Sequence, residues 1–533
     1  MRRTSALWLV TVVACGASGT RGADVPDATE VVDISPPDTA EPADVPIEAT
    51  EAVDAAEVFA AEAEVAEMTA DSADVVEVVD ASPALPLTPP GPGFHVSGTA
   101  VVDDQGRTLL MHGCDVSNYA KYSPDLLTWE QPADFAALAD LGFGTIRLLT
   151  FWAAIMPEEG KVDTAYVDAF VERIDWAAAA GLTVIVDMHQ DIFGVGFGDN
   201  GAPRWACDES LYASYKPSEP WYVNYTAPEV KACFQRFYHD DKLFGEFQDA
   251  WVALATRLAD HPAVVGFDLL NEPNPSGDDA AKWVRDVWQP REEQLAKAIH
   301  AVAPHRVVFF QGATLANIGM DDPFVPSPDP AVAYAPHYYH PLVHDGGAYD
   351  HDSMAPMIDA SVDAIAMSAA ALGGRPVWMG EFGGPTDVPN FDSYLEDMLT
   401  RFESHAWGWA FYGDDKGDSF SFREADGSLR EHVVARLAHP YARRVPGTVV
   451  GAASDFASQA FETRFRWEYD APVEAWTGRG GLPGNVVVAP ADDPTATVPC
   501  VAAAGAAAGV VECTPAPGTT RYGAEYLVSF AQP

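Results

Sequence analysis

The chain has 533 residues, of which 48% are hydrophobic and 11% aromatic, which is ample for a large buried core. This length exceeds one ordinary domain and allows a barrel together with an accessory module. The formal net charge is −48, and the sequence shows no concentrated group of basic residues. A nucleic-acid binder needs such a basic face, so binding to nucleic acid is excluded as a function.

The first fifteen residues are typical of an export signal. Two arginines at positions 2 and 3 precede a short apolar run, Ala6–Ala14, that is followed by Cys15. The run is too short to span a bilayer. A small residue directly before a cysteine resembles the lipobox of bacterial lipoproteins. We therefore expect an outer-membrane or cell-surface lipoprotein acylated at Cys15, with simple cleavage near Ala17 or Gly19 and secretion as the alternative.

Residues 16–90 are rich in Ala, Val, Asp, Glu and Pro and contain almost no aromatic residues. Within them, residues 24–80 hold eighteen acidic residues and no lysine or arginine. Such a segment buries too little apolar surface to offset its conformational entropy. We predict a disordered, self-repelling spacer that is dispensable for catalysis, with a functional acidic ligand as the alternative.

Residues 91–440 alternate short apolar runs with amphipathic helical segments. Near-continuous apolar runs are typical of strands buried on both faces of a parallel sheet. The predicted strands are Thr108–Val116, Gly144–Phe151, Thr183–Met188, Val264–Leu270, Arg306–Gln311, Val332–Pro336, Val377–Gly380 and Trp407–Tyr412. The predicted helices include Ala133–Leu141, Tyr166–Ala180, Phe247–Leu258, Ala281–Val302 and Met357–Leu372. Eight such units in series predict an α/β fold, a closed (β/α)8 TIM barrel.

Residues 441–533 lack helical periodicity and carry Gly, Pro and Thr turns around short apolar runs. The runs Phe461–Tyr469, Asn485–Val488 and Tyr526–Phe530 are predicted strands. The segment as a whole predicts a small β-sandwich accessory domain.

Four cysteines fall into two local pairs. Cys207 and Cys233 share one insertion, and Cys500 and Cys513 share the C-terminal segment. Both pairs are disulfide candidates in an exported protein. Cys114 lies alone on the first predicted strand, where we expect a buried free thiol.

Two glutamates lie where barrel enzymes place their catalytic groups, at the carboxyl ends of strands. Glu272 follows the fourth predicted strand and Glu381 follows the seventh, and these strands face one another across an eight-stranded barrel. Retaining glycoside hydrolysis needs two carboxyl groups about 5–5.5 Å apart, one protonated and one ionised. We expect Glu272 to be the acid/base and Glu381 the nucleophile. The alternative is that both are structural carboxylates paired with arginine.

Other polar residues at the predicted strand ends suit supporting roles. Arg147 and Tyr339 are expected to keep Glu381 ionised through charge and hydrogen bonding. Asn271 is expected to bind a sugar 2-hydroxyl, a contact that strengthens as oxocarbenium character develops.

His189 and His337 are expected to position other groups rather than to act as general bases. The alternative for His337 is that it forms a metal cluster with His340 and His344. That segment contains a proline and no supporting helix, so we expect no metal and no other cofactor.

These residues together resemble glycoside hydrolase family 5. Barrel members of that family carry Asn-Glu-Pro after strand four, a catalytic Glu after strand seven, and an Arg, two His and a Tyr at other strand ends. The residues that match, in chain order, are Arg147, His189, Asn271, Glu272, His337, Tyr339 and Glu381. The resemblance implies a retaining O-glycosidase that needs no cofactor.

A narrower resemblance, to endoglycoceramidases, covers residues 95–440. It is carried by Asn118–Asp125, Asp187–Asp191, Asn200–Trp205 and Phe267–Pro273. In that group a lysine and the second aspartate of the strand-three motif bind the sugar beside the scissile bond, which corresponds to Lys121 and Asp191 here.

The endoglycoceramidase resemblance implies hydrolysis between the glycan and the ceramide of glycosphingolipids, with release of intact oligosaccharide. Within the same family, the alternatives are a β-glucosidase for glucosylceramide or steryl glucosides and an endo-β-glucanase. A non-catalytic surface lipoprotein that binds carbohydrate is the alternative from another class. We expect a monomer whose partners are the glycosphingolipid or other β-glycoside substrate and the membrane.

The eighth predicted strand departs from the family pattern. Family members usually place a Trp under the sugar, whereas the spacing within Trp407–Asp414 puts Tyr412 there. Tyr412 is expected to stack on the sugar instead, and Trp409 is either a second substrate contact or a core residue.

An insertion of about fifty residues follows the third predicted strand, which is too long for an ordinary βα loop. It opens with an apolar, Gly-rich run, Ile192–Phe197, and continues with several aromatic residues. We expect the insertion either to accommodate a lipid aglycone or to pack around the Cys207 and Cys233 pair.

Overall fold

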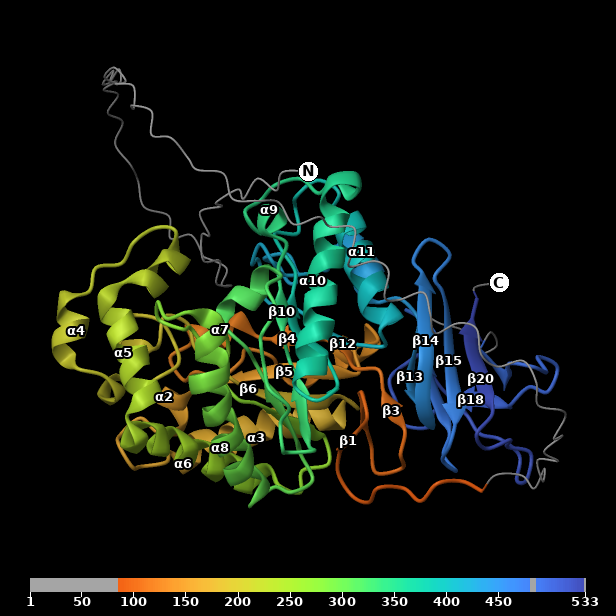
Figure 1. Cartoon of the computed structure of the whole chain (residues 1–533). Coiled ribbons are helices and arrows are strands. Elements are labelled where there is room, and N and C mark those ends of the chain that lie inside the picture. Colours follow the sequence, from red (N-terminus) through yellow and green to blue (C-terminus); the bar gives the residue numbers. More distant parts are fainter. Residues whose placement is uncertain (1–84, 480–485, 532–533) are drawn as a thin grey trace, which may run out of the picture. The chain divides into compact units, whose positions relative to one another are not determined.

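The computed structural model describes residues 85–479 and 486–531, which belong to one compact unit (Figure 1). The predicted signal peptide, Cys15 and the spacer up to residue 84 lie outside the described residues. No helix in the described part of the chain is long and apolar enough to cross a membrane.

A parallel β-barrel forms the centre of the described residues. Its strands are β4 (His112–Val116), β5 (Thr145–Thr150), β6 (Thr183–Met188), β7 (Val264–Asp268), β8 (Val307–Phe310), β9 (Val332–Tyr334), β10 (His337–Tyr338), β11 (Trp378–Phe382) and β12 (Gly408–Phe411). Strand β12 pairs with β4, and a parallel bridge from Tyr334 to Val377 connects β9 to the start of β11. The sheet therefore closes on itself.

Strands β9 and β10 together occupy the sixth position of the barrel. Pro336, which lies between them, has no amide hydrogen to give to the ladder, so the strand is interrupted there. The carbonyl of Pro336 still accepts a hydrogen bond from the amide of Gly380 at 2.9 Å. With this interruption the barrel has eight strand positions, and the predicted α/β fold with a TIM barrel is confirmed.

Helices surround this barrel (Figure 1). They are α1 (Pro132–Asp140), α2 (Trp152–Ile155), α3 (Thr164–Ala179), α4 (Glu209–Ser214), α5 (Pro228–His239), α6 (Asp241–Leu258), α7 (Ala280–Trp283), α8 (Gln289–His300), α9 (Pro341–His344), α10 (His351–Ala371), α11 (Phe391–Ser404) and α12 (Glu431–Leu437). Short 3-10 turns are η1 (Asn118–Lys121), η2 (Val195–Phe197), η3 (Arg204–Ala206), η4 (Trp221–Thr226) and η6 (Thr314–Ile318). Apolar residues three or four positions apart bury one face of the long helices, as Phe247, Trp251 and Leu254 do in α6.

The predicted helix Ala281–Val302 is divided in the structure. A π-helical turn, η5 (Val284–Trp288), separates α7 from α8. Pro290 stands at the start of α8 and has no amide hydrogen for the carbonyl four residues earlier, so the α-helical ladder is interrupted there.

Two antiparallel sheets contain the strands that follow the barrel. The first has the order β1-β2-β3-β13-β16-β19-β18, and the second has the order β14-β15-β20-β17. Their strands are β1 (His95–Ser97), β2 (Ala100–Val102), β3 (Thr108–Leu109), β13 (Tyr441–Val445), β14 (Gly447–Asp455), β15 (Ala460–Trp467), β16 (Val473–Trp476), β17 (Val486–Pro490), β18 (Cys500–Ala502), β19 (Val510–Cys513) and β20 (Glu525–Phe530). Alternate residues of β15 are buried, so one face of its sheet is covered. The predicted C-terminal β-domain is confirmed.

The first of these sheets also uses residues from before the barrel, which the sequence analysis did not anticipate. The prediction of one strand over Thr108–Val116 is wrong, because β3 ends at Leu109 and pairs with β13, whereas β4 begins at His112 in the barrel. Between them, the amide of Leu110 donates to the carbonyl of Arg443 at 3.0 Å. Residues 95–109 thus belong with the C-terminal strands.

The structure forms both disulfides that were expected. Cys207 and Cys233 join the segment after η3 to α5, and Cys500 and Cys513 join β18 to β19. Cys114 is a buried free thiol on β4.

Candidate active site

Two buried carboxylates converge where β7 and β11 end. Glu272 follows β7 by four residues, Glu381 lies within β11, and each is 1% exposed. Nδ1 of His337 lies 2.9 Å from Oε1 of Glu272 and 3.4 Å from Oε2 of Glu381. An oxygen of each glutamate and a nitrogen of His337 lie within 4.8 Å of one another. The structure thus places the two glutamates together, across the barrel, as the sequence predicts.

Arg147, at the centre of β5, connects this pair to a ring of buried carboxylates. Its Nη1 lies 2.6 Å from Oε1 of Glu381 and 3.0 Å from Oδ1 of Asp115. Its Nη2 lies 2.9 Å from Asp268 and 2.9 Å from Asp187. One guanidinium therefore faces four carboxylates. Burial raises the pKa of Asp115 well above its ordinary value and the pKa of Asp268 to about 7, which limits the negative charge in the ring.

Both oxygens of Glu381 are held by hydrogen-bond donors. The hydroxyl of Tyr339 donates to Oε2 at 2.9 Å, opposite the guanidinium of Arg147 on Oε1. Burial raises the pKa of Glu381, and the positive charges of Arg147, His189 and Lys121 lower it, with a net rise. These donors fix the orientation of Glu381 and stabilise its ionised form.

Glu272 has partners of a different kind. The side-chain amide of Asn317, from η6, donates to its Oε1 at 2.7 Å. Burial lowers the pKa of His337 well below its ordinary value, so this second partner is a neutral imidazole. The backbone of Glu272 has φ of 45° and its amide donates to Oε1 of Gln311 at 3.0 Å, which fixes the turn that carries the side chain.

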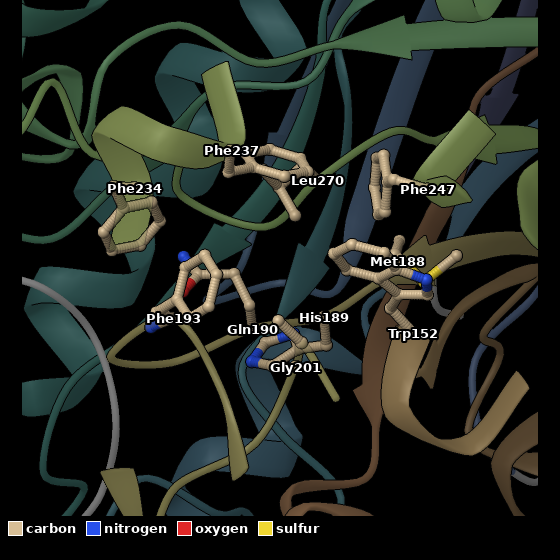
Figure 2. A pocket seen from close by; sticks show the side chains of 11 residues that line it. Trp152, Met188, His189, Gln190, Phe193, Gly201, Phe234, Phe237, Phe247 and Leu270 are labelled. Atoms are coloured by element: carbon tan, nitrogen blue, oxygen red, sulfur yellow. The ribbon is translucent and has the colours of Figure 1, made fainter. Parts of the chain in front are cut away.

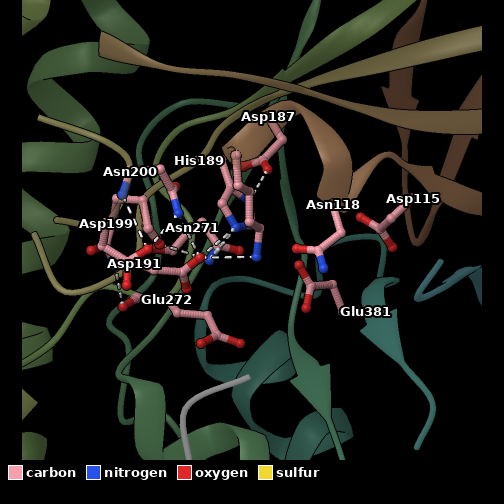
Figure 3. Close-up of polar contacts among 12 residues, drawn as sticks. Asp115, Asn118, Asp187, His189, Asp191, Asp199, Asn200, Asn271, Glu272 and Glu381 are labelled. Carbon is pink, nitrogen blue, oxygen red and sulfur yellow. Dashed lines mark hydrogen bonds and ion pairs between the residues drawn. The ribbon is translucent and has the colours of Figure 1, made fainter. Parts of the chain in front are cut away.

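His189 continues the polar network beside Glu272 (Figure 3). Its Nδ1 lies 2.6 Å from Oδ2 of Asp187, and its Nε2 lies 3.4 Å from Oδ2 of Asp191. Burial lowers the pKa of His189 and the flanking aspartates raise it, with a net rise. His189 is therefore held by carboxylates on both sides and serves to position them.

Lys121 and Asp191 form a buried ion pair in the same network. The two side chains approach to 2.9 Å. Asn200 donates to the same carboxylate oxygen of Asp191 at 2.9 Å (Figure 3). Burial opposes charge on both groups, yet their attraction holds the pKa of Asp191 well below its usual range and that of Lys121 well above it. A charged pair of this kind offers fixed donors and acceptors for sugar hydroxyls.

Asn271 lies between the arginine and the histidine. Its Oδ1 accepts from Nη2 of Arg147 at 3.0 Å, and its Nδ2 lies 3.4 Å from Nε2 of His189 and donates to the carbonyl of Gln190 at 3.1 Å. These contacts fix the orientation of the amide next to Glu272, where a 2-hydroxyl contact is expected.

Tyr412 follows β12 and lies at the same end of the barrel. Its hydroxyl donates to Oδ1 of Asn118 at 2.8 Å, and Nζ of Lys121 lies 5.3 Å from the centre of its ring. With Tyr339 and Phe420 it forms a small aromatic cluster that is separate from the main core. The structure therefore brings Tyr412 to the predicted sugar site.

Of the two roles considered for Trp409, the structure supports the second, that of a core residue. Its side chain is fully buried and stacks on His112 at 4.6 Å, with Phe382 edge-on at 5.7 Å. Side chains alternate along a strand, so Trp409 and Phe411 pack in the outer core while Ala410 joins the inner one. Trp409 is a core residue.

The aromatic insertion after β6 is mostly packed against the barrel. Figure 2 shows Phe193, Phe234, Phe237, Phe247 and Trp152 around a cavity next to the backbone of β6. That cavity is about 20 Å³, room for roughly one water molecule and not for an acyl chain. These buried side chains serve packing around the Cys207–Cys233 disulfide, the second of the two roles considered for the insertion.

The other histidines after β10 do not share a site with His337. Nδ1 of His344 lies 3.1 Å from its neighbour Asp345, and His340 directly precedes α9. Among the described residues, the group that includes His337 is completed by Glu272 and Glu381.

Several site residues were missed by sequence reasoning. Asp115 lies within the buried strand β4 and Asp268 ends the otherwise apolar strand β7, and a charged residue in such a strand was an available signal. Gln311 ends the predicted strand Arg306–Gln311, so its position at a strand end was also an available signal, whereas nothing in the local pattern marks Asn317 in η6.

Comparison with known proteins agrees with this geometry. Endoglycoceramidase I of Rhodococcus hoagii (strain 103S) is 33% identical over 257 residues, which are 45% of this chain and 52% of that protein, about half its length. Endoglycoceramidase of Cyanea nozakii is 25% identical over 411 residues, covering 68% of this chain and 79% of that protein. Endo-glycoceramidase II from Rhodococcus sp. in complex with ganglioside GM3 superposes with a TM-score of 0.73 at 25% identity, covering 82% of this chain and 100% of that one.

The same Rhodococcus sp. enzyme solved as a lactosyl-enzyme intermediate gives a TM-score of 0.72, with 83% of this chain and 100% of that chain covered. A model of the cellulase domain of glycosyl hydrolase family 5 matches residues 102–416, a span that contains both glutamates, Arg147, His337 and Tyr339. On this match and on the order of its site residues, the chain belongs to glycosyl hydrolase family 5.

Proposed function

We propose that this chain is a retaining β-glycosidase that hydrolyses the bond between the glycan and the ceramide of glycosphingolipids and releases the intact oligosaccharide. The convergence of Glu272 and Glu381 on His337 supports the chemistry. Their oxygens lie within 4.8 Å of that nitrogen and of each other, whereas an inverting enzyme needs a gap of about 6.5–9.5 Å for its water. The endoglycoceramidases among its relatives support the substrate class.

In the first step Glu381 is the nucleophile. Its ionised oxygen attacks the anomeric carbon, while Glu272 donates a proton to the glycosidic oxygen and the bond to ceramide breaks. Arg147 and Tyr339 support this assignment because they hold Glu381 as a carboxylate. The neutral partners Asn317 and His337 suit Glu272 to carry a proton.

In the second step the roles of Glu272 change. Its carboxylate takes a proton from water, the water oxygen attacks the anomeric carbon, and the bond to Glu381 breaks to release the glycan. Asn271 binds the sugar 2-hydroxyl, and the Lys121–Asp191 pair binds further hydroxyls beside the face of Tyr412.

Exposed apolar side chains after the carboxyl ends of barrel strands support a lipid aglycone. Tyr122 follows η1 and is 63% exposed, Leu342 in α9 is 58% exposed, and Met320 after η6 is 47% exposed. They follow β4, β10 and β8 respectively, so they lie on the same end of the barrel as the two glutamates. Exposed apolar groups around a polar sugar site suit an amphipathic substrate.

The test is a product analysis with three substrates: a ganglioside, glucosylceramide and soluble cellulose. We expect intact oligosaccharide and ceramide from the ganglioside. Free glucose from glucosylceramide alone would indicate a β-glucosidase, and chain fragments from cellulose an endoglucanase. The Glu381→Gln variant serves as the control for contaminating activity. Tight sugar binding without turnover of any substrate would indicate a carbohydrate-binding protein.

We also propose that the protein is exported and anchored through an acylated Cys15, and that it acts as a monomer. The basic start, the short apolar run and the cysteine of the first fifteen residues support export and acylation. Incorporation of labelled palmitate into the wild type, and its loss in Cys15→Ala, is the expected result. Equal labelling of both proteins, or none, would contradict acylation at this residue. Light scattering of the detergent-solubilised protein measures its mass and so tests whether it is a monomer.

A further inference from the structure

A second cluster of two histidines and a glutamate lies away from the candidate active site. His112 is the first residue of β4, Glu403 lies in the last turn of α11, and His439 precedes β13. One ligand atom from each side chain lies within 4.8 Å of the others, and all three residues are at most 3% exposed. His112 stands at the amino end of its strand, whereas the catalytic glutamates lie at carboxyl ends, so the two clusters are separate.

His112 is the member of this cluster whose contacts are incomplete. Neither of its ring nitrogens has a hydrogen-bond partner, although the residue is 2% exposed. Its ring faces stack between Tyr441 at 4.0 Å and Trp409 at 4.6 Å, which leaves only the ring edge free to make polar contacts. A buried imidazole normally satisfies both nitrogens, so an unpaired edge beside two potential metal ligands points to a missing partner.

His439 is oriented as a metal ligand would be. Its Nδ1 lies 2.8 Å from the carbonyl of Arg436, a carbonyl that can only accept, so this nitrogen carries the proton. The remaining nitrogen, Nε2, lies 2.5 Å from Oε1 of Glu403. A lone pair this close to a carboxylate oxygen is repulsive unless a cation or a second proton lies between them. Metal-binding histidines commonly donate their other N–H to a carbonyl in this way.

We propose that His112, Glu403 and His439 bind a structural zinc ion. Two imidazole nitrogens and one carboxylate oxygen are ligands that Zn²⁺ accepts, and among divalent first-row ions such a set favours zinc or copper. The ion would join barrel strand β4 to α11 and to the chain entering β13, the strand that leads into the C-terminal sheets. Its effect would be on stability, and the chemistry at Glu272 and Glu381 would not require it.

The alternative partner for His439 is a proton. Burial lowers the pKa of His439 and Glu403 raises it, with a net rise, so an imidazolium–carboxylate pair can form without a metal. That pair leaves the edge of His112 unsatisfied, because neither of its ring nitrogens has a hydrogen-bond partner. A metal satisfies all three side chains at once.

The test is the zinc content of the full-length protein after dialysis against a weak chelator. We expect about one zinc per chain in the wild type and in Glu381→Gln, and loss of that zinc in Glu403→Gln. His439→Gln should also lose it. His405→Gln is the matched control, since His405 stacks on Trp407 next to the cluster without joining it. Zinc-loaded wild type should unfold at a higher temperature than metal-free wild type, and this difference should vanish in Glu403→Gln.

Three results would overturn the proposal. The first is that the wild type retains no zinc, and the second is that Glu403→Gln retains as much zinc as the wild type. The third is that only Glu381→Gln loses zinc, which would place the ion on Glu272, His337 and Glu381. If Glu403→Gln fails to fold, X-ray absorption of the zinc-loaded wild type decides. It should show two imidazole nitrogens at about 2.0–2.1 Å, and any other ligand set contradicts the assignment.

Discussion

The contact from Tyr339 to Glu381 is the simplest single-atom test of how the nucleophile is held. Tyr339→Phe removes the hydrogen bond to Oε2 and leaves the ring in place. A hydrogen bond to a charged group contributes about 1.5–3 kcal/mol, so kcat/KM should fall roughly 10- to 100-fold. Tyr338→Phe is the matched control, because Tyr338 is the adjacent buried tyrosine and packs in the main core, whereas Tyr339 packs with Tyr412 and Phe420. Steady-state kinetics on a ganglioside provides the measurement, and equal effects of both variants would contradict the role of Tyr339.

The Lys121–Asp191 pair predicts a pH-dependent stability. The lowered pKa of Asp191 gives stability that is present above its unfolded value of about 4 and is lost as pH falls toward the folded value. The raised pKa of Lys121 gives stability that is present below its unfolded value of about 10.4 and is lost as pH rises toward the folded value. The pair therefore stabilises the fold between about pH 4 and pH 10.

Lys121→Met should accordingly destabilise the protein by about 3–5 kcal/mol at pH 7 and by less at pH 3, where Asp191 of the unfolded chain is protonated. Urea unfolding at both pH values is the measurement. Lys161→Met removes an exposed pair with Glu158 and should change stability by less than about 1 kcal/mol at either pH. A Lys121→Met effect that is the same at both pH values would show that the pair is not the cause.

At this scale the sequence predicted most of the site, because strand position and strand end could be read from apolar runs. Glu272, Glu381, Arg147 and Tyr339 follow directly from such runs. The sequence left two roles open for Trp409, because its position relative to the barrel interior depends on the register of β12, which a short apolar run does not fix.

Among the elements, the insertion after β6 offers a test of what holds it. Its Cys207–Cys233 disulfide closes a loop with a sequence separation of 26 residues. Loop-closure entropy for that length gives about 3–4 kcal/mol of stabilisation, with the size dependent on residual structure in the unfolded chain. The double variant Cys207→Ser/Cys233→Ser should lose that amount in urea unfolding under oxidising conditions.

Reduced wild type is the control for this double variant. Reduction breaks both disulfides, so the free energy of unfolding of reduced wild type should equal that of the double variant after subtraction of the contribution of the Cys500–Cys513 disulfide. The Cys500→Ser/Cys513→Ser variant measures that contribution, because it lacks only the disulfide between β18 and β19, which closes a sequence separation of 13 residues. A change below about 1 kcal/mol in Cys207→Ser/Cys233→Ser would mean that aromatic packing alone holds the insertion.

The predicted strands were confirmed where the local pattern of apolar residues alone determines the strand. Strand β6 has the predicted bounds, and all six of its residues are buried, as expected for a strand covered on both faces. The division of residues 108–116 between β3 and β4 was missed, because both strands are fully buried and the apolar pattern continues through the turn between them. The partner that separates them, β13, lies more than three hundred residues away, and local pattern does not report on it.

For the whole molecule, we predict that the segment before the described residues is dispensable for catalysis. Removal of residues 16–84 should leave kcat/KM on a soluble β-glycoside within about twofold of the wild type, because every candidate site residue lies beyond residue 110. The cut preserves Leu87, whose amide donates to the carbonyl of Glu468 at 2.8 Å.

Circular dichroism of the truncated protein supplies the control for folding. A truncated protein that folds but does not turn over would contradict the prediction and assign the segment a part in catalysis. The joining of residues 95–109 with strands after residue 440 also means that a cut beyond residue 95 should destabilise the C-terminal sheets.

The most direct measurement for the central claim is to trap the covalent intermediate. A 2-deoxy-2-fluoro glycoside with a good leaving group should slow the second step more than the first, so the glycosyl-enzyme accumulates. Mass spectrometry of the digested protein should then find one fluorosugar on the peptide that contains Glu381. A label on Glu272, or inactivation without any covalent sugar, would contradict the assignment of Glu381 as nucleophile and Glu272 as acid/base.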